Sequence, residues 1–238
     1  NLEQSQSILQ SSRPTAPSQS GAPLVVGASH VTGEPLLPEV LREAQTVAAT
    51  DTGVTTLLAG NATEPNVAAH LASASLIHFA GHATRYQGTT RMLLASTGQP
   101  GDKPWLDTPL LLKNPPRAAR LVVFSACSTG KREEGWDHDM GDIVDTLASL
   151  GVPEVVATRW QIDSASAVPM MRVFYQGLAN GLKVPQALTS ARKSLARDAR
   201  YSHPYYWAAW YASGTGNTDL REIFHGESSK ENSERAER

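Results

Sequence analysis

The sequence lacks most of the features that mark easily recognised classes of protein. It has one cysteine in 238 residues, which excludes an internal disulfide framework and any site built from several thiolates. Its formal net charge is −2, so it lacks the basic excess with which nucleic-acid-binding proteins neutralise phosphates. The longest apolar runs, such as 121–124 and 153–157, have the length of strands and are far too short to span a membrane. These absences favour a cytoplasmic protein that binds neither nucleic acid nor membrane.

The composition predicts one folded domain between two polar ends. Residues 1–21 are rich in Ser, Gln and Pro and are typical of a linker. Residues 215–238 form a polar tail that we expect to be largely disordered, except for one short docking turn at Leu220, Ile223 and Phe224. The folded domain therefore spans 22–214. Because the chain starts with Asn1 and not with Met, we expect it to have been processed or cut from something longer.

Short apolar runs alternate with helical patterns along the domain. The strands are predicted at 24–26, 55–58, 76–80, 121–126, 155–158 and 206–211. Helices are predicted to begin near residues 38, 64, 139, 164 and 185. Strands that are apolar on both faces and alternate with helices form parallel sheets covered by helices. The sequence therefore predicts an α/β fold with a mostly parallel six-stranded sheet.

Two reactive side chains follow predicted strands whose carboxyl ends meet at one edge of that sheet. The third strand leads into His82, and the fourth leads into Cys127. Functional groups of open parallel sheets gather at this edge. A cysteine and a histidine supply what acyl transfer to a thiol needs, because the imidazole takes the thiol proton and later protonates the leaving amine. Each residue alone is more often structural, but together they favour a catalytic pair.

The order and spacing of these residues are similar to those of caspases, since His82 precedes Cys127 by 45 residues. His78 lies inside the third strand, and we expect it to pack or to orient its neighbours. A zinc site that used His78 and His82 would need further ligands, for which the sequence offers no candidates. We therefore predict neither a metal nor a cofactor.

At several places the sequence resembles the CHAT domain, a caspase-like cysteine peptidase of the clan that also contains separases and metacaspases. The resemblance rests on HFAGHA around His82, SACSTG around Cys127, LASLGVPEVVATRWQID and HPYYWAAWYASG, and it covers about 22–213. It implies a caspase-like three-layer α/β/α sandwich and a His82–Cys127 dyad that cuts peptide bonds. It also implies an oxyanion hole made by the backbone amides of Cys127 and Ala83.

The chain departs from the family pattern at two places. The family usually has Gly where this chain has Ala83, so the oxyanion hole requires a backbone there that is not left-handed. The family commonly reads W-x-V-D-D after the fifth strand, and here Ser164 replaces the second acid. In related separases an acidic residue of this stretch helps to select a basic P1 side chain, a role open to Asp163, whereas Arg159 would favour an acidic P1. We rank both roles below a simpler interpretation, in which Asp163 caps the helix that starts at Ser164.

We therefore expect a cysteine endopeptidase that cleaves a specific protein partner, with Cys127 as nucleophile and His82 as general base. Members of the family usually follow tetratricopeptide or other sensor domains, and many serve bacterial antiviral defence or cell death. The resemblance thus implies a regulatory domain or subunit as a partner and activation by proteolysis. Two alternatives stay open. One is a catalytically silent CHAT-like module that only binds proteins, which Ala83 favours, and the other is a hydrolase of small amides or esters.

Overall fold

The structure, a computed structural model, describes residues 21–51, 53–87, 89–128 and 141–224. Its central sheet has the strand order β2-β1-β3-β6-β7-β8 along its main path, and every neighbouring pair on that path is parallel except β7 with β8. The six strands are β1 (Leu24–Ala28), β2 (Thr55–Leu58), β3 (Leu76–Tyr86), β6 (Leu121–Ser128), β7 (Glu154–Thr158) and β8 (Trp210–Gly214). The predicted α/β fold with a mostly parallel sheet is confirmed.

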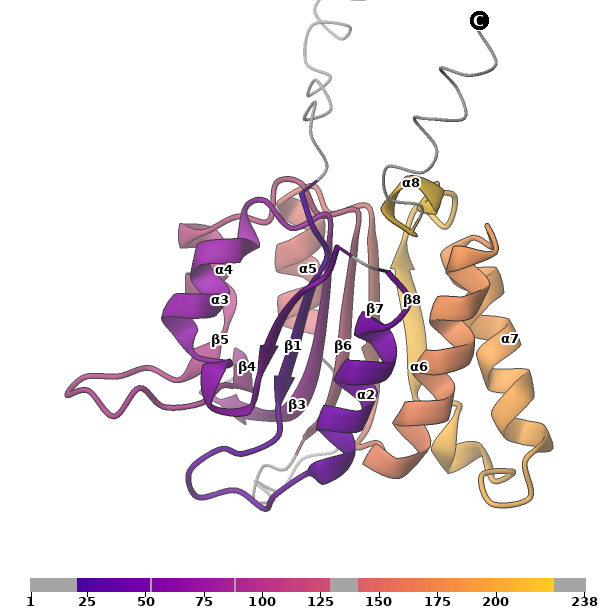
Figure 1. Ribbon diagram of the computed structural model, residues 1–238, viewed down its shortest axis with the longest axis horizontal. Helices are drawn as coiled ribbons and strands as arrows, with labels where there is room; N and C mark the ends of the chain where they lie inside the picture. Colours follow the sequence, from indigo (N-terminus) through magenta and orange to yellow (C-terminus); the bar gives the residue numbers. More distant parts are fainter. Residues whose placement is uncertain (1–20, 52, 88, 129–140, 225–238) are drawn as a thin grey trace, which may run out of the picture.

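Helices cover both faces of the sheet and make three layers (Figure 1). One face carries α2 (Pro38–Ala48), α6 (Ser164–Ala179), α7 (Val184–Arg197) and the short α8 (Arg221–Phe224). The other carries α3 (Glu64–Leu71), α4 (Thr108–Lys113) and α5 (Gly141–Ser149). Two 3₁₀ turns, Ala59–Asn61 and Pro204–Tyr206, lie between these elements. The sheet is buried on both sides, as its apolar strands predict; all five residues of β1 are buried, for example.

The predicted end of the third strand is wrong, and the difference shapes the site. We expected this strand to stop at Ala80, but β3 continues to Tyr86 and pairs in antiparallel fashion with β4 (Thr89–Leu93), which in turn pairs with β5 (Trp105–Leu106). The last pair between β1 and β3 joins Ala28 to Gly81. Beyond that pair β4 takes the place of β1, which gives the exposed backbone groups of β3 new partners.

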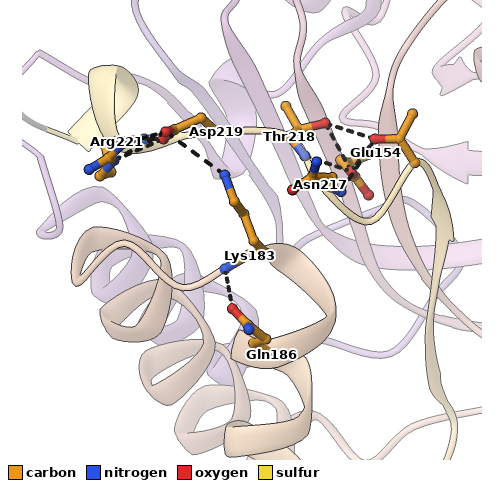
Figure 2. A network of polar contacts seen from close by, with 8 residues as sticks. Glu154, Lys183, Gln186, Asn217, Thr218, Asp219 and Arg221 are labelled. Atoms are coloured by element: carbon orange, nitrogen blue, oxygen red, sulfur yellow. Dashed lines mark hydrogen bonds and ion pairs between the residues drawn. The ribbon is translucent and has the colours of Figure 1, made fainter.

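The segment after β8 is held at the amino end of β7, at the edge of the sheet opposite to the loop after β1 (Figures 1 and 2). Glu154 is buried, and its Oε1 accepts hydrogen bonds from Thr215 Oγ1 at 2.8 Å, Thr218 Oγ1 at 2.9 Å and Thr218 N at 3.3 Å. The predicted docking turn is confirmed, because its three apolar residues are buried against α6 and its neighbours: Leu220, Ile223 and Phe224. The division at 21/22 and 214/215 stays a prediction.

Within the described ranges, no helix is both long enough and apolar enough to cross a membrane.

Candidate active site

His82 and Cys127 are register partners in the parallel pair formed by β3 and β6. Parallel partners occupy neighbouring strands at the same level, about 4.8 Å apart, and share a face of the sheet. Position 127 has the same parity in β6 as Leu121 and Val123, which belong to the core beneath α2 and α6. The side chain of Cys127 lies outside the described part of the structure, so the backbone register carries this point. The structure brings the two predicted residues to one place.

The imidazole of His82 is oriented by a backbone carbonyl that the sequence analysis did not single out. His82 is fully buried, and its Nε2 lies 2.8 Å from the carbonyl oxygen of Pro35. Because a carbonyl oxygen only accepts, Nε2 must carry a proton and donate it. In the neutral imidazole Nδ1 then holds the lone pair, and it has no hydrogen-bond partner among the described residues. The contact leaves Nδ1 as the atom that can receive a proton.

Gly81 lets β1 approach closely just before the histidine. A Cβ at this position would lie 3.1 Å from the carbonyl oxygen of Ala28 and 3.1 Å from Cζ of Phe79. Such contacts are tighter than ordinary packing, and the atoms involved belong to a paired strand and a buried ring. The glycine in the HFAGHA motif therefore has a structural reason.

Ala83 follows His82 in the same strand, with Ser128 as its partner on β6 and Met92 as its partner on β4. Its φ is not positive. Alanine is therefore unstrained here, which meets the condition that the sequence set for an oxyanion hole. The assignment of the Ala83 and Cys127 amides to that hole stays a prediction.

His78 belongs to a buried polar cluster beneath the site. Its Nε2 lies 3.2 Å from Oε1 of Glu43 on α2, and its Nδ1 lies 3.0 Å from the hydroxyl of Tyr175 on α6. All three side chains are buried. Burial, together with the nearby carboxylate of Glu43, raises the pKa of Tyr175 well above its usual value. The cluster joins α2, β3 and α6, which agrees with a packing or orienting role for His78. Among the described residues, no group of three or more His, Cys, Asp or Glu side chains could hold a metal ion.

The two residues proposed to contact the P1 side chain have other contacts in this structure. Asp163 is the N-cap of α6, and its Oδ2 accepts a hydrogen bond from the Ser166 amide at 2.8 Å. The capping interpretation is confirmed. Arg159 is exposed, and its guanidinium lies 4.7 Å from the ring centre of Tyr211. Burial and, to a lesser degree, the charge of Arg159 lower the pKa of Arg192. The contact with Tyr211 brings the Arg159 side chain to β8, so both substrate-binding roles stay predictions.

This combination of sheet order, helical layers and a His–Cys register pair defines a caspase-like peptidase fold. The crystal structure of caspase-1 from Spodoptera frugiperda has the same fold, with a TM-score of 0.50 over 83% of this chain and 89% of that chain, at 9% identity. The arginine-specific cysteine proteinase gingipain R (RgpB) aligns with a TM-score of 0.46 over 82% of this chain and 46% of that chain, at 11% identity. At such low identity the likeness concerns the fold alone.

The chain belongs to the CHAT domain family, whose sequence profile matches residues 2–215. The human tetratricopeptide repeat protein 28 is 31% identical over 98 residues. That match covers 40% of this chain and 4% of the length of the human protein.

Proposed function

We propose that this chain is a cysteine endopeptidase that uses Cys127 as nucleophile and His82 as general base. The observation that carries the proposal is the register of β3 and β6, which pairs the two residues on adjacent strands. The tautomer of His82 also supports the proposal. Because Nε2 donates its proton to the Pro35 carbonyl, Nδ1 is the nitrogen that can accept the thiol proton.

The residues then divide the reaction as follows. Nδ1 of His82 takes the thiol proton, and the sulfur of Cys127 attacks the carbonyl carbon of the scissile peptide bond. The C–N bond breaks while the imidazolium returns its proton to the leaving amine. Water, deprotonated by the same nitrogen, hydrolyses the thioester and restores the thiol. The Pro35 carbonyl keeps Nε2–H in place throughout and stabilises the positive charge of the imidazolium. The amides of Cys127 and Ala83 are our candidates to hold the oxyanion.

Arg159 and Asp163 are the candidates to contact the P1 side chain. Arg159 directly follows β7, the strand next to the one that carries Cys127, and its guanidinium is exposed. An acidic P1 side chain would complement its charge. Asp163 would favour a basic P1 side chain instead, but its carboxylate already caps α6. Arg159 is therefore the better candidate of the two.

We further propose that the substrate is a protein and that a tetratricopeptide or other sensor domain controls cleavage, in a defence or cell-death response. The similarity to a human protein named for its tetratricopeptide repeats supports that partner. Identifying new protein N-termini in a lysate treated with active protein, against Cys127→Ala, would reveal the substrate.

The test of the activity is labelling by thiol-directed peptide electrophiles with different P1 residues, under a range of activating conditions. We expect wild type to be labelled at Cys127 at least about 100-fold faster than His82→Ala, because a positioned general base contributes about 10² to 10⁴. Equal labelling of the two proteins with every electrophile would refute the peptidase proposal. It would favour the silent interaction module, although the backbone at Ala83 gives that alternative no support.

A further inference from the structure

The end of the loop between β1 and α2 and the first residue of α2 form a run of four apolar residues, Pro35-Leu36-Leu37-Pro38. None of the four is buried, and Leu36 is 62% exposed, the highest value among the large hydrophobic side chains of the described part. Single exposed leucines are common and need no explanation. Four consecutive apolar residues without burial are unusual at a protein surface. Their contact with water is unfavourable, and it is relieved when a partner binds there.

The loop that carries this run is held in one shape. The amide of Leu37 donates to the carbonyl of Ser29 at 3.1 Å, which closes the loop at its base. The amide of Glu34 donates to the carbonyl of Val31 at 3.0 Å, in a tight turn where Gly33 has a φ of +87°. The Val31 side chain is buried in the core. The apolar run is therefore a preorganised surface, and its occupation would cost little ordering entropy.

The run also lies beside the catalytic base. The carbonyl oxygen of Pro35 is 2.8 Å from Nε2 of His82, and standard backbone dimensions place Cα of Leu36 about 3 Å from that oxygen. Cα of Leu36 is thus within roughly 6 Å of the imidazole. In Figure 1 the loop follows the end of β1 at the lower edge of the sheet, toward which the parallel strands β3 and β6 also run.

Leu112 provides a useful contrast, because it is almost equally exposed, at 60%, without these features. It lies on α4, where Leu110 and Leu111 are buried and Lys113 is exposed. It is an isolated apolar side chain on the outer side of a short helix, and α4 packs on the face of the sheet opposite to α2.

We propose that the Pro35–Pro38 segment is a substrate subsite, in which Leu36 receives an apolar side chain of the bound peptide at a position other than P1. The inference rests on the peptidase function proposed above and adds the chemical class of one substrate residue. A substrate chain bound across the dyad must pass the imidazole, and the surface that it meets beside Pro35 is apolar and rigid. An apolar side chain there gains burial, whereas a charged side chain would lose hydration against the apolar run.

A positional-scanning library of fluorogenic peptides tests the subsite with the full chain. Four variants are compared with wild type: Leu36→Ser, Leu36→Gln, Leu36→Met and the control Leu112→Ser. For wild type we expect one position at which Leu, Ile, Met or Phe is preferred over Ala. The polar substitutions at Leu36 should lower the Leu-to-Ala ratio of kcat/KM at that position about 10-fold, whereas Leu36→Met and Leu112→Ser should keep it. The ratio does not respond to a general loss of active enzyme, and Leu36→Gln repeats the test if Leu36→Ser folds poorly.

The outcomes separate the two proposals. If wild type cleaves no peptide and shows no His82-dependent labelling, the peptidase function fails and the subsite fails with it. If wild type cleaves peptides but has no apolar preference, or if both polar variants retain it, only the subsite is refuted.

Discussion

Two substitutions at Asp163 can distinguish a structural role of its side chain from a substrate-binding role, because they remove its charge and its hydrogen-bond acceptor separately. Asp163→Asn removes the charge but keeps a side-chain oxygen that can accept the Ser166 amide. Asp163→Ala removes the charge and the acceptor together. Asn and Asp are about equally good at the N-cap, and replacement of either by Ala costs about 0.5–2 kcal/mol.

The structure places the expected cost near the middle of that range. Asp163 is half-buried, and its Oδ2 receives the Ser166 amide at 2.8 Å. The second bond of this cap, from Ser166 Oγ to the Asp163 carbonyl at 2.7 Å, survives both substitutions. We therefore expect Asp163→Ala to lose about 1 kcal/mol of unfolding free energy. In a domain of this size that loss lowers Tm by about 2–4 °C. Asp163→Asn should stay within a few tenths of a kcal/mol of wild type.

Thermal and urea denaturation measure both variants, with Asp145→Ala as a control that removes one exposed carboxylate from another helix. Equal stability of wild type and Asp163→Ala would refute the capping argument. If Asp163→Asn were as unstable as Asp163→Ala, the helix would depend on the charge and not on the hydrogen bond. The P1 profile decides the other role: selective loss of Lys- and Arg-directed cleavage in a stable Asp163→Asn would assign the carboxylate to substrate recognition.

Two further predictions concern buried polar groups away from the dyad. Glu154→Ala leaves three donors of Thr215 and Thr218 without their shared acceptor, so we expect a loss of about 2 kcal/mol of unfolding free energy in urea; an unchanged midpoint would contradict this. The pKa of Tyr175 is raised above its usual value of 10.0 by burial, so the neutral phenol stabilises the fold fully below that pH, and the contribution is lost as pH rises beyond it. The difference in unfolding free energy between wild type and Tyr175→Phe should therefore narrow above about pH 10. A constant difference would contradict this, because it would mean that the pKa of Tyr175 is the same in the folded and unfolded chain.

The parallel core of the sheet could be predicted from the sequence because its strands carry a two-sided apolar signal. Strands such as β1 and β7 are buried at every position, and apolar runs of this length between helical patterns have few other uses. The start of the helix Ser164–Ala179 was predicted correctly, since Asp163 is a strong N-cap signal. These features are local in the chain.

The elements that the sequence analysis missed or misplaced depend on distant partners. Residues 81–86 mix glycine, histidine, threonine and arginine, and they are extended because β4 and β6 pair with them. The last strand was predicted at 206–211 but forms at Trp210–Gly214, because Pro204–Tyr206 makes a 3₁₀ turn and the register with β7 starts only at Trp210. The buried neighbours of His78 come from two helices, at Glu43 and Tyr175. Periodicity within a segment carries no information about such partners.

The candidate site shows the same division between local and distant causes. The pairing of His82 with Cys127 follows from two apolar strands that run parallel, so two motifs and their strand context were enough to predict it. The proton-accepting atom of His82 depends instead on Pro35, which precedes it by 47 residues and reaches it only because β1 ends opposite Gly81 and its chain turns back toward the sheet. The apolar pattern of the strands thus accounts for the place where His82 and Cys127 meet. The loop between β1 and α2 determines the rest: its Pro35 carbonyl leaves Nδ1 of His82 free to accept a proton, and it places Leu36 beside the imidazole.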